Sequence, residues 1–135
     1  MVNDLISDTL TRIRNANLKK HDVVWILNTK TNWKILSLLK KEGFIKKITL
    51  IKKAKGWVNG ALVIKLNYLG QSKRPCITHL KRLSSPSLRF YSSYKDIPTF
   101  LNGMGVVILT TSKGFMTDRT ARALKLGGEI LFSIW

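Results

Sequence analysis

Toward the C-terminus, one short run of residues combines the groups that recognise irregular RNA. It reads Thr110-Thr111-Ser112-Lys113-Gly114. The three hydroxyls can donate to and accept from base edges and 2′-hydroxyls, and Lys113 can neutralise a phosphate. Gly114 lets the backbone approach a ligand closely. An ordinary serine-rich turn ahead of a helix cap is the alternative, whereas a Walker-type phosphate loop is excluded because lysine precedes the glycine.

Four more residues are candidates for the same surface. Arg89 and Tyr91 lie two apart in a predicted strand over 88–91 and so share a face, where Tyr91 can stack on a base while Arg89 holds a phosphate. Packing of Tyr91 in the core is the alternative. Glu129 can accept from a base amine or orient a basic side chain, and an intradomain salt bridge is equally open. Gly128 is interpreted first as part of a helix stop at Gly127-Gly128 and second as a close-approach surface.

Lysines and tryptophans elsewhere are weaker candidates. Lys30 and Lys55 are selected as anchors for an RNA backbone, although most lysines of this kind only face solvent. Trp25 is expected in the core. Trp33 and Trp57 are expected to be partly exposed, with Trp57 as a candidate stacking surface in a basic turn over 52–60.

The charge balance favours a polyanionic partner. The chain holds 24 Lys and Arg against 7 Asp and Glu, a formal net charge of +17, and the excess runs through both halves. Nucleic acid ranks ahead of an anionic membrane or an acidic protein, because a polyphosphate gains most from counterion release. Apolar runs such as 106–109 are far too short for a membrane span. No membrane partner is therefore expected.

Nothing in the sequence supports catalysis. His21 and His79 are far apart, Cys76 is the single cysteine, and no metal-ligand spacing joins them. We expect no metal, no cofactor, no small-molecule substrate and no enzymatic activity. The lone cysteine fits a reducing compartment, and the acidic opening of the chain resembles neither a signal nor a transit peptide.

Periodicity predicts an N-terminal α-β-α-β-β domain over residues 1–69. A helix capped by Asn3 or Asp4 carries the apolar stripe Ile6, Leu10 and Ile13. A buried strand over 23–27, a second helix over about 31–43 that ends at a glycine, and strands over 44–51 and 61–68 follow.

A polar, basic stretch over 70–75 marks the predicted boundary, and residues 70–135 form a β-rich domain. We expect an extended segment over 76–80, the short strand over 88–91, a helical turn over 97–103 and a strong strand over 106–110. A loop over 111–115 leads into a helix capped by Thr117, and a strand over 129–135 ends the chain. The predicted fold class is α+β, with antiparallel strands and a short helix after the RNA-binding loop.

The second domain carries motifs of a known family. The chain resembles small-subunit ribosomal protein eight, whose Ser-Thr-Ser-x-Gly-x-Met-Thr-Asp-Arg motif corresponds to residues 110–119. Ala121-Arg122 and Gly127-Gly128-Glu129 follow as in the family. Earlier segments that are similar to the family pattern are residues 10–16, Glu42-Gly43-Phe44-Ile45, Leu80-Lys81-Arg82-Leu83-Ser84 and Gly103-Met104-Gly105. The Tyr-Ser-x-Tyr stretch at 91–94 and the terminal Ile-Trp resemble plastid members.

The resemblance implies two small domains that bind the central domain of small-subunit rRNA and nucleate subunit assembly. It adds Lys81 and Arg82, in the linker motif, to the candidate RNA contacts. It implies ribosomal proteins five and twelve as neighbours and the plastid stroma as location, with a bacterial-type cytoplasm or another organelle as alternatives. Two other classes stay open: a free-standing nucleic-acid chaperone or translational regulator, and a nuclease or deaminase, which would need a metal site.

Overall fold

The computed structural model describes residues 2–135 apart from 54, 58 and 86, with side chains described from Leu5 onward. The chain divides into two compact units, Met1–Ile77 and Thr78–Trp135. Each is a mixed α/β unit built on an antiparallel sheet, which confirms the predicted α+β class.

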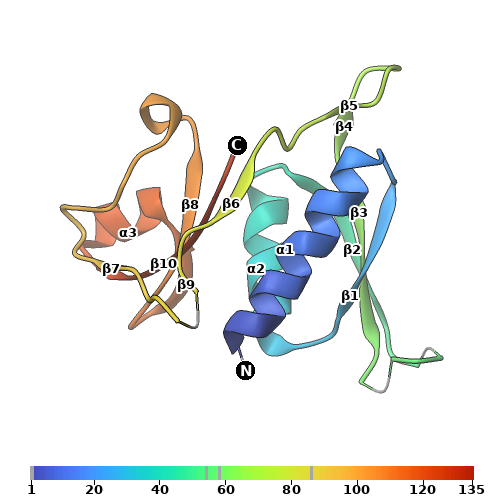
Figure 1. Cartoon of the computed structure of the whole chain (residues 1–135), viewed down its shortest axis with the longest axis horizontal. Coiled ribbons are helices and arrows are strands. Elements are labelled where there is room, and N and C mark those ends of the chain that lie inside the picture. The colour runs from blue at the N-terminus through green and yellow to red at the C-terminus, as the bar shows by residue number, and fades with distance from the viewer. Residues whose placement is uncertain (1, 54, 58, 86) are drawn as a thin grey trace. The chain divides into compact units, whose positions relative to one another are not determined.

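The N-terminal unit places two helices on one face of a three-stranded sheet (Figure 1). Its elements are α1 (Val2–Leu18), β1 (Val23–Leu27), α2 (Lys30–Lys41), β2 (Ile45–Ile51) and β3 (Ala61–Leu66). The strands are antiparallel in the order β1-β3-β2. The described elements therefore follow the predicted α-β-α-β-β order.

Both helices form in the predicted segments but begin earlier than predicted, α1 at Val2, ahead of the predicted caps at Asn3 and Asp4, and α2 at Lys30. The predicted stripe of α1, Ile6, Leu10 and Ile13, is at most 2% exposed. Thr29 caps α2 by accepting a hydrogen bond from the Asn32 backbone N–H at 3.1 Å. After α2 the chain turns at Gly43, whose φ of +91° suits glycine.

The expectation that β1 is a buried strand with Trp25 in the core is wrong. Val24 and Ile26 face the helices and are at most 7% exposed, whereas Val23 and Trp25 on the other face are 46% and 38% exposed. Strand side chains alternate between faces, and the helices cover only one face of this sheet (Figure 1).

The N-terminal unit extends beyond the predicted boundary after Leu69. Strand β4 (Tyr68–Leu69) pairs with β5 (Arg74–Pro75), so the predicted strand over 61–68 is split in two at Asn67. Past this small hairpin, the Asn17 side chain donates to the Ile77 carbonyl at 2.8 Å. These contacts keep the basic stretch with the N-terminal unit.

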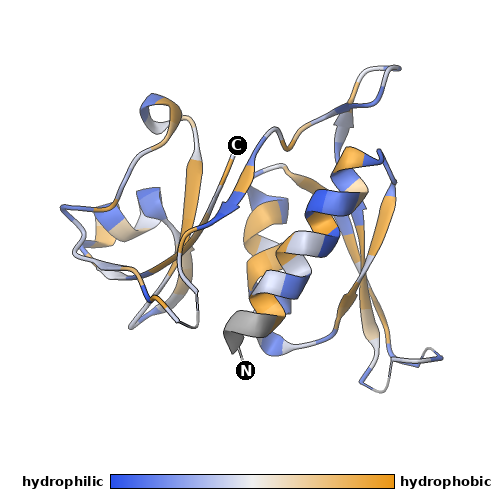
Figure 2. Ribbon diagram, in the orientation of Figure 1, coloured by the Kyte–Doolittle hydropathy of each residue, from blue (hydrophilic) through white to orange (hydrophobic). Residues whose placement is uncertain are grey.

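In its described residues, the C-terminal unit is a five-stranded antiparallel sheet with one α-helix. Its elements are β6 (Leu80–Arg82), β7 (Tyr91–Ser92), a 3-10 turn (Leu101–Gly103), β8 (Val106–Thr111), β9 (Gly114–Thr117), α3 (Asp118–Leu124) and β10 (Gly128–Ile134). The order is β6-β10-β8-β9, and β7 also pairs with β10. Apolar residues concentrate in β8 and β10 (Figure 2). The core cluster consists of Ile97, Val107, Leu109, Met116, Ala121 and Ile130.

Four predicted boundaries in this unit are corrected. The strand expected over 88–91 is limited to Tyr91–Ser92, and the helical turn expected over 97–103 is limited to Leu101–Gly103. The loop expected over 111–115 already contains the start of β9 at Gly114. Helix α3 ends at Leu124 with Lys125 in the left-handed region, so the double glycine is not its stop.

Among the described residues, no helix is long and apolar enough to cross a membrane.

Candidate nucleic-acid interface

The N-terminal end of β10 brings most of the candidate residues together. Gly128 pairs with Ser92 on one side and Thr111 on the other, and Glu129 pairs with Tyr91 and Thr110. Directly opposed residues in antiparallel strands share a face. Tyr91, Glu129 and Thr110 therefore form one cross-strand row, which Phe115 of β9 extends. We call this end of the sheet the β10 entry.

The Thr110–Gly114 run forms the tight turn that joins β8 to β9. Thr111 pairs with Gly114, so Ser112 and Lys113 are the two tip residues, and both are exposed. The Thr111 hydroxyl accepts from the Lys113 backbone N–H and donates to the Gly114 carbonyl, each at 3.1 Å. This hydroxyl is engaged inside the turn, and Ser112 and Lys113 present their side chains outward.

The left-handed position of the turn falls on Gly114. Its φ is +105°, and a Cβ added there would meet nothing within 4 Å. Neither Ser112 nor Lys113 has a positive φ, which fits a type I turn with glycine at the fourth position. Glycine is therefore required for backbone conformation and not for space.

Glu129 resolves one of the open alternatives, because it forms a salt bridge within the unit. Its side chain is 8% exposed and accepts from Arg89 Nη1 at 3.1 Å, with Arg89 46% exposed. Ser84 Oγ donates to the second carboxylate oxygen at 3.1 Å. The carboxylate thus fixes Arg89 at the β10 entry, which also matches the interpretation that Glu129 orients a basic side chain.

Tyr91 lies at the surface. It is 69% exposed, so the alternative of core packing is wrong. The short strand β7 holds its backbone against Glu129, and the Phe90 carbonyl accepts from the Ile130 N–H at 2.8 Å. The phenol ring is therefore exposed and available for stacking, while the strand pairing holds the backbone of Tyr91 in place.

The two glycines before Glu129 allow neighbouring backbones to approach. A Cβ on Gly127 would lie 2.5 Å from the Ser92 carbonyl oxygen, and one on Gly128 would overlap the Thr110 carbonyl oxygen. Real Cβ atoms essentially never come this close to backbone. Gly127 and Gly128 are sheet-packing residues, and this role replaces the predicted helix stop.

The other end of the hairpin is anchored through α3. Thr117 caps the helix by accepting from the Thr120 N–H, as predicted. Asp118 is 2% exposed, accepts from the Val107 N–H at 3.3 Å and pairs with Arg122 at 2.8 Å. The turn therefore projects from two strands that are tied to a capped helix.

Four predicted contacts are not part of the β10 entry. Lys30 and Lys55 belong to the N-terminal unit, where both are exposed. Lys81 pairs with Ser133 near the far end of β10, about 13 Å along the strand from Glu129. Arg82 is partly buried and donates to the Ser84 carbonyl.

Sequence reasoning missed Ser84. It is 1% exposed, and its hydroxyl accepts from the Phe90 N–H at 3.1 Å while donating to Glu129. It fixes the segment that leads into Arg89 and Tyr91. The family linker motif ends at Ser84 and so distinguished it from Ser85 and Ser87, but no sequence pattern linked it to Glu129.

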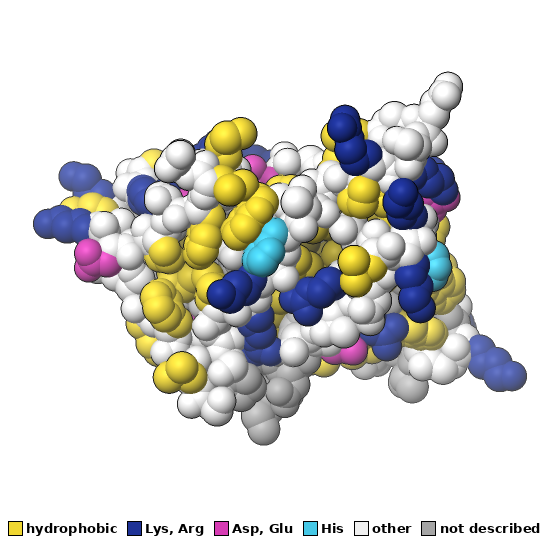
Figure 3. Space-filling model, turned by 45° about the horizontal axis from the view of Figure 1, so that its top comes forward, with side chains coloured by type: hydrophobic (Ala, Val, Ile, Leu, Met, Phe, Trp, Pro, Cys, Tyr) yellow, Lys and Arg dark blue, Asp and Glu magenta, His cyan; other side chains and the backbone are white. Residues whose placement is uncertain are grey.

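Basic side chains are spread over the face in Figure 3, with few acidic ones among them. Within the described residues, no group of His, Cys, Asp and Glu could hold a metal ion. Exposed hydroxyl, cationic and aromatic groups at one end of a sheet are typical of a binding surface.

The family is shown by comparison with known proteins. The family model described as Ribosomal protein S8 matches residues 4–135. The chain is 62% identical to "Small ribosomal subunit protein uS8c" of Tupiella akineta and 53% identical to the protein of that name in Oltmannsiellopsis viridis, over the full length of both chains in each case. It is 48% identical to "Small ribosomal subunit protein uS8" of Nostoc punctiforme over 98% of each chain. The chain belongs to the ribosomal protein S8 family.

Family membership settles the class of function. The chain is a structural, non-enzymatic protein of the small ribosomal subunit. The relatives named uS8c are the chloroplast form, and the chain is of this plastid type, as the motifs at 91–94 and at the C-terminus predicted.

Proposed function

We propose that the chain binds the central domain of small-subunit rRNA directly through the β10 entry and thereby nucleates assembly of the subunit. The observation that carries this proposal is the exposed Ser112-Lys113 tip, held by an internally bonded Thr111 beside the exposed Tyr91. RNA is recognised mainly at irregular positions, where small polar groups and aromatic rings can reach bases and sugars.

Each group has a separate role. Ser112 contacts a base edge or a 2′-hydroxyl, Lys113 neutralises a phosphate, and Tyr91 stacks. Arg89, fixed by Glu129, supplies a second phosphate contact. Thr111, Gly114 and Gly128 set the geometry, with Thr110 at the base of the hairpin.

The remaining basic residues add affinity without fixing register. We assign Lys30, Lys55, Lys81 and Arg82 to phosphate contacts, each with a smaller contribution than the tip. Such contacts act through counterion release and weaken as salt rises. Ribosomal proteins five and twelve are the proposed protein neighbours.

The experiment is a filter-binding titration with a transcribed fragment of the central domain. We expect Ser112→Ala to weaken binding about fivefold and Lys113→Ala about tenfold, with the salt slope of Lys113→Ala reduced by about one. Lys34→Ala, an exposed lysine on α2, is the matched charge control. Far-ultraviolet circular dichroism should be unchanged in all three variants. Wild-type affinity in both tip variants would contradict the proposal.

The assembly role has its own test. Reconstitution of the subunit from purified parts, with this chain omitted, should slow incorporation of the neighbouring proteins. Restoring the Lys113→Ala variant should leave part of that defect, because the variant binds rRNA more weakly. Equal incorporation rates with and without the chain would count against nucleation.

A further inference from the structure

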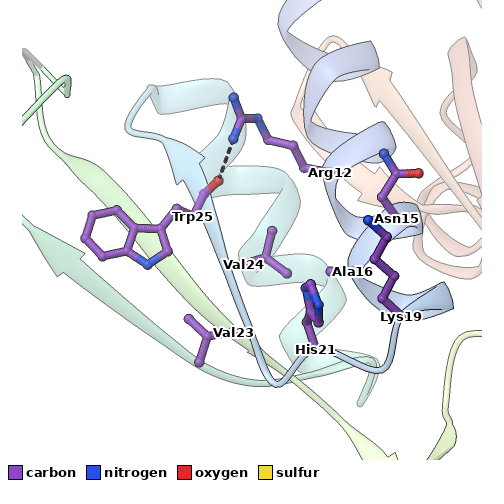
Figure 4. Close-up of a pocket in the computed structure, with 8 residues that line it drawn as sticks. All are labelled: Arg12, Asn15, Ala16, Lys19, His21, Val23, Val24 and Trp25. Carbon is purple, nitrogen blue, oxygen red and sulfur yellow. Dashed lines mark hydrogen bonds between the residues drawn. The ribbon is translucent and has the colours of Figure 1, made fainter.

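The proposed interface leaves unused a pocket in the N-terminal unit between α1 and β1. Its volume is about 270 Å³, just below the roughly 300–1,000 Å³ typical of small-molecule sites. Polar side chains of α1 line one wall and the start of β1 lines the other (Figure 4). A hollow of this size has room for one nucleotide.

The polar wall favours an anion. It consists of Arg12, Asn15 and Lys19, with His21 at the turn into β1 (Figure 4). None of the residues that line the pocket is acidic. Arg12 pairs with Asp8 at 3.0 Å on the surface of α1, and Lys19 is exposed. Lys19 is thus placed to take a phosphate.

On the β1 side the lining is apolar and aromatic, and it continues around the edge strand, because Val23 and Trp25 project from the sheet face opposite the helices (Figure 4). Trp25 and Val23 are exposed although both are hydrophobic. The rings of Trp25 and Trp57 lie 6.0 Å apart at 48°, and the Arg12 guanidinium lies 5.4 Å from the Trp57 ring centroid. Tryptophan faces and guanidinium planes are the surfaces on which unpaired bases stack.

The edge of the sheet supplies backbone hydrogen-bond donors and acceptors. In the described sheet β1 is an edge strand, and the Asp22 carbonyl accepts from the Leu66 N–H of β3. Backbone polar groups alternate along an antiparallel strand, so those of Val23 and Trp25 point to the open edge. The Trp25 carbonyl accepts from Arg12 at 3.4 Å. The N–H and C=O of Val23 form a donor and acceptor pair beside the pocket.

We propose that this pocket binds one unpaired nucleotide of an RNA strand. The nucleotide crosses the edge of β1: its base lies against Trp25 and Val23 on the outer face of the sheet, and its phosphate lies at Lys19 on the α1 side. The inference rests on the proposed function in that the partner is RNA, but it uses a different unit of the chain. A protein strand added to β1 is disfavoured. Such a strand would need the Trp25 carbonyl as a hydrogen-bond acceptor, and this carbonyl already accepts from Arg12.

The test measures binding of a fluorescent oligoadenylate of about eight nucleotides to the full chain. We expect Trp25→Leu to weaken binding about tenfold and Lys19→Ala about threefold. Trp33→Leu and Lys34→Ala on α2 are matched controls, since Trp33 is 45% exposed. Both should stay within about twofold of wild type, and a duplex of equal length should compete poorly. Wild-type binding in both pocket variants, or an equal loss in Trp33→Leu, overturns the proposal.

Two further experiments distinguish RNA binding at the pocket from RNA binding at the β10 entry and from contact with a protein. Trp25→Leu and Lys19→Ala should cause the same fold-losses in a Lys113→Ala background as in the wild-type chain, so a failure of the proposed function leaves the pocket result intact, and the reverse also holds. A photocrosslinker at Val23 in intact small subunits should label rRNA. Labelling of a protein alone contradicts the inference.

Discussion

The two ends of β10 are built for different purposes. At the far end Phe132, Ser133 and Ile134 are fully buried, between β6 and β8. At the β10 entry, Gly128 and Glu129 lie between Tyr91, which is 69% exposed, and the hairpin that carries Ser112 and Lys113. One strand thus has a packed end that holds the fold and a polar end that presents groups outward. Substitutions at the buried end should therefore lower stability, and substitutions at the β10 entry should mainly lower RNA affinity.

The largest effect on stability is expected at the buried end. Phe132→Ala removes a fully buried aromatic side chain and should lower the free energy of unfolding by about 3–5 kcal/mol. Denaturant unfolding measures this loss. The rRNA affinity of the folded fraction should stay within about twofold of wild type. A large loss of affinity in the folded protein would show that the two ends are not separable.

Gly128→Ala should affect both properties. Its Cβ would overlap the Thr110 carbonyl oxygen, so β8 and β10 must move apart locally. This change should lower the free energy of unfolding by about 1–3 kcal/mol. Because Thr110 lies in β8 next to the turn, a shift there should displace Ser112 and Lys113, and rRNA affinity should also fall.

Gly114→Ala is the control for Gly128→Ala, because its Cβ has open space and only the positive φ of +105° is strained. It should cost about 1–2 kcal/mol. A harmless Gly128→Ala, judged by unfolding and filter binding, would refute the close-approach role of this glycine.

Glu129→Gln tests whether the buried carboxylate acts through Arg89. The change keeps the side-chain shape but weakens the ion pair, whose arginine is 46% exposed. Stability should fall by only about 1 kcal/mol, because solvent screens the pair. We expect a roughly fivefold loss of rRNA affinity, since Arg89 is less well held. If Arg89→Ala and the double variant lose the same amount, Glu129 is a positioning residue; additive losses would indicate that it contacts RNA itself.

The smallest effect is expected from Lys81. This exposed lysine on β6 lies opposite Ser133, at the buried end of β10. Lys81→Ala should leave unfolding unchanged and weaken rRNA binding by about twofold, with a slightly shallower salt dependence. A loss as large as that of Lys113→Ala would move the centre of the interface away from the hairpin.

Local patterns predicted what local forces determine. The apolar stripe of α1, the Thr117 cap and strand β8 depend on neighbouring residues in the chain, and the structure confirms them. The hydroxyl-rich run was predicted as an RNA contact from its residue types together with the family resemblance. Its division into an internal Thr111 and an outward Ser112 depends on turn geometry that composition does not specify.

Tertiary contacts account for the errors. The expectation of a buried Trp25 failed because burial of a strand depends on which face the helices cover. The double glycine was taken for a helix stop because its true neighbours, Ser92 and Thr110, are distant in sequence. The pairing of Glu129 with Arg89 and Ser84 likewise joins segments that no local pattern links.

The most direct measurement places a photocrosslinker at Ser112 in the assembled small subunit. The proposed interface predicts crosslinks to nucleotides of the rRNA central domain, and a crosslinker at Trp33 on α2 should give none there. Crosslinks from Ser112 only to protein, in particles that contain the chain, would contradict the central claim that the hairpin tip contacts RNA.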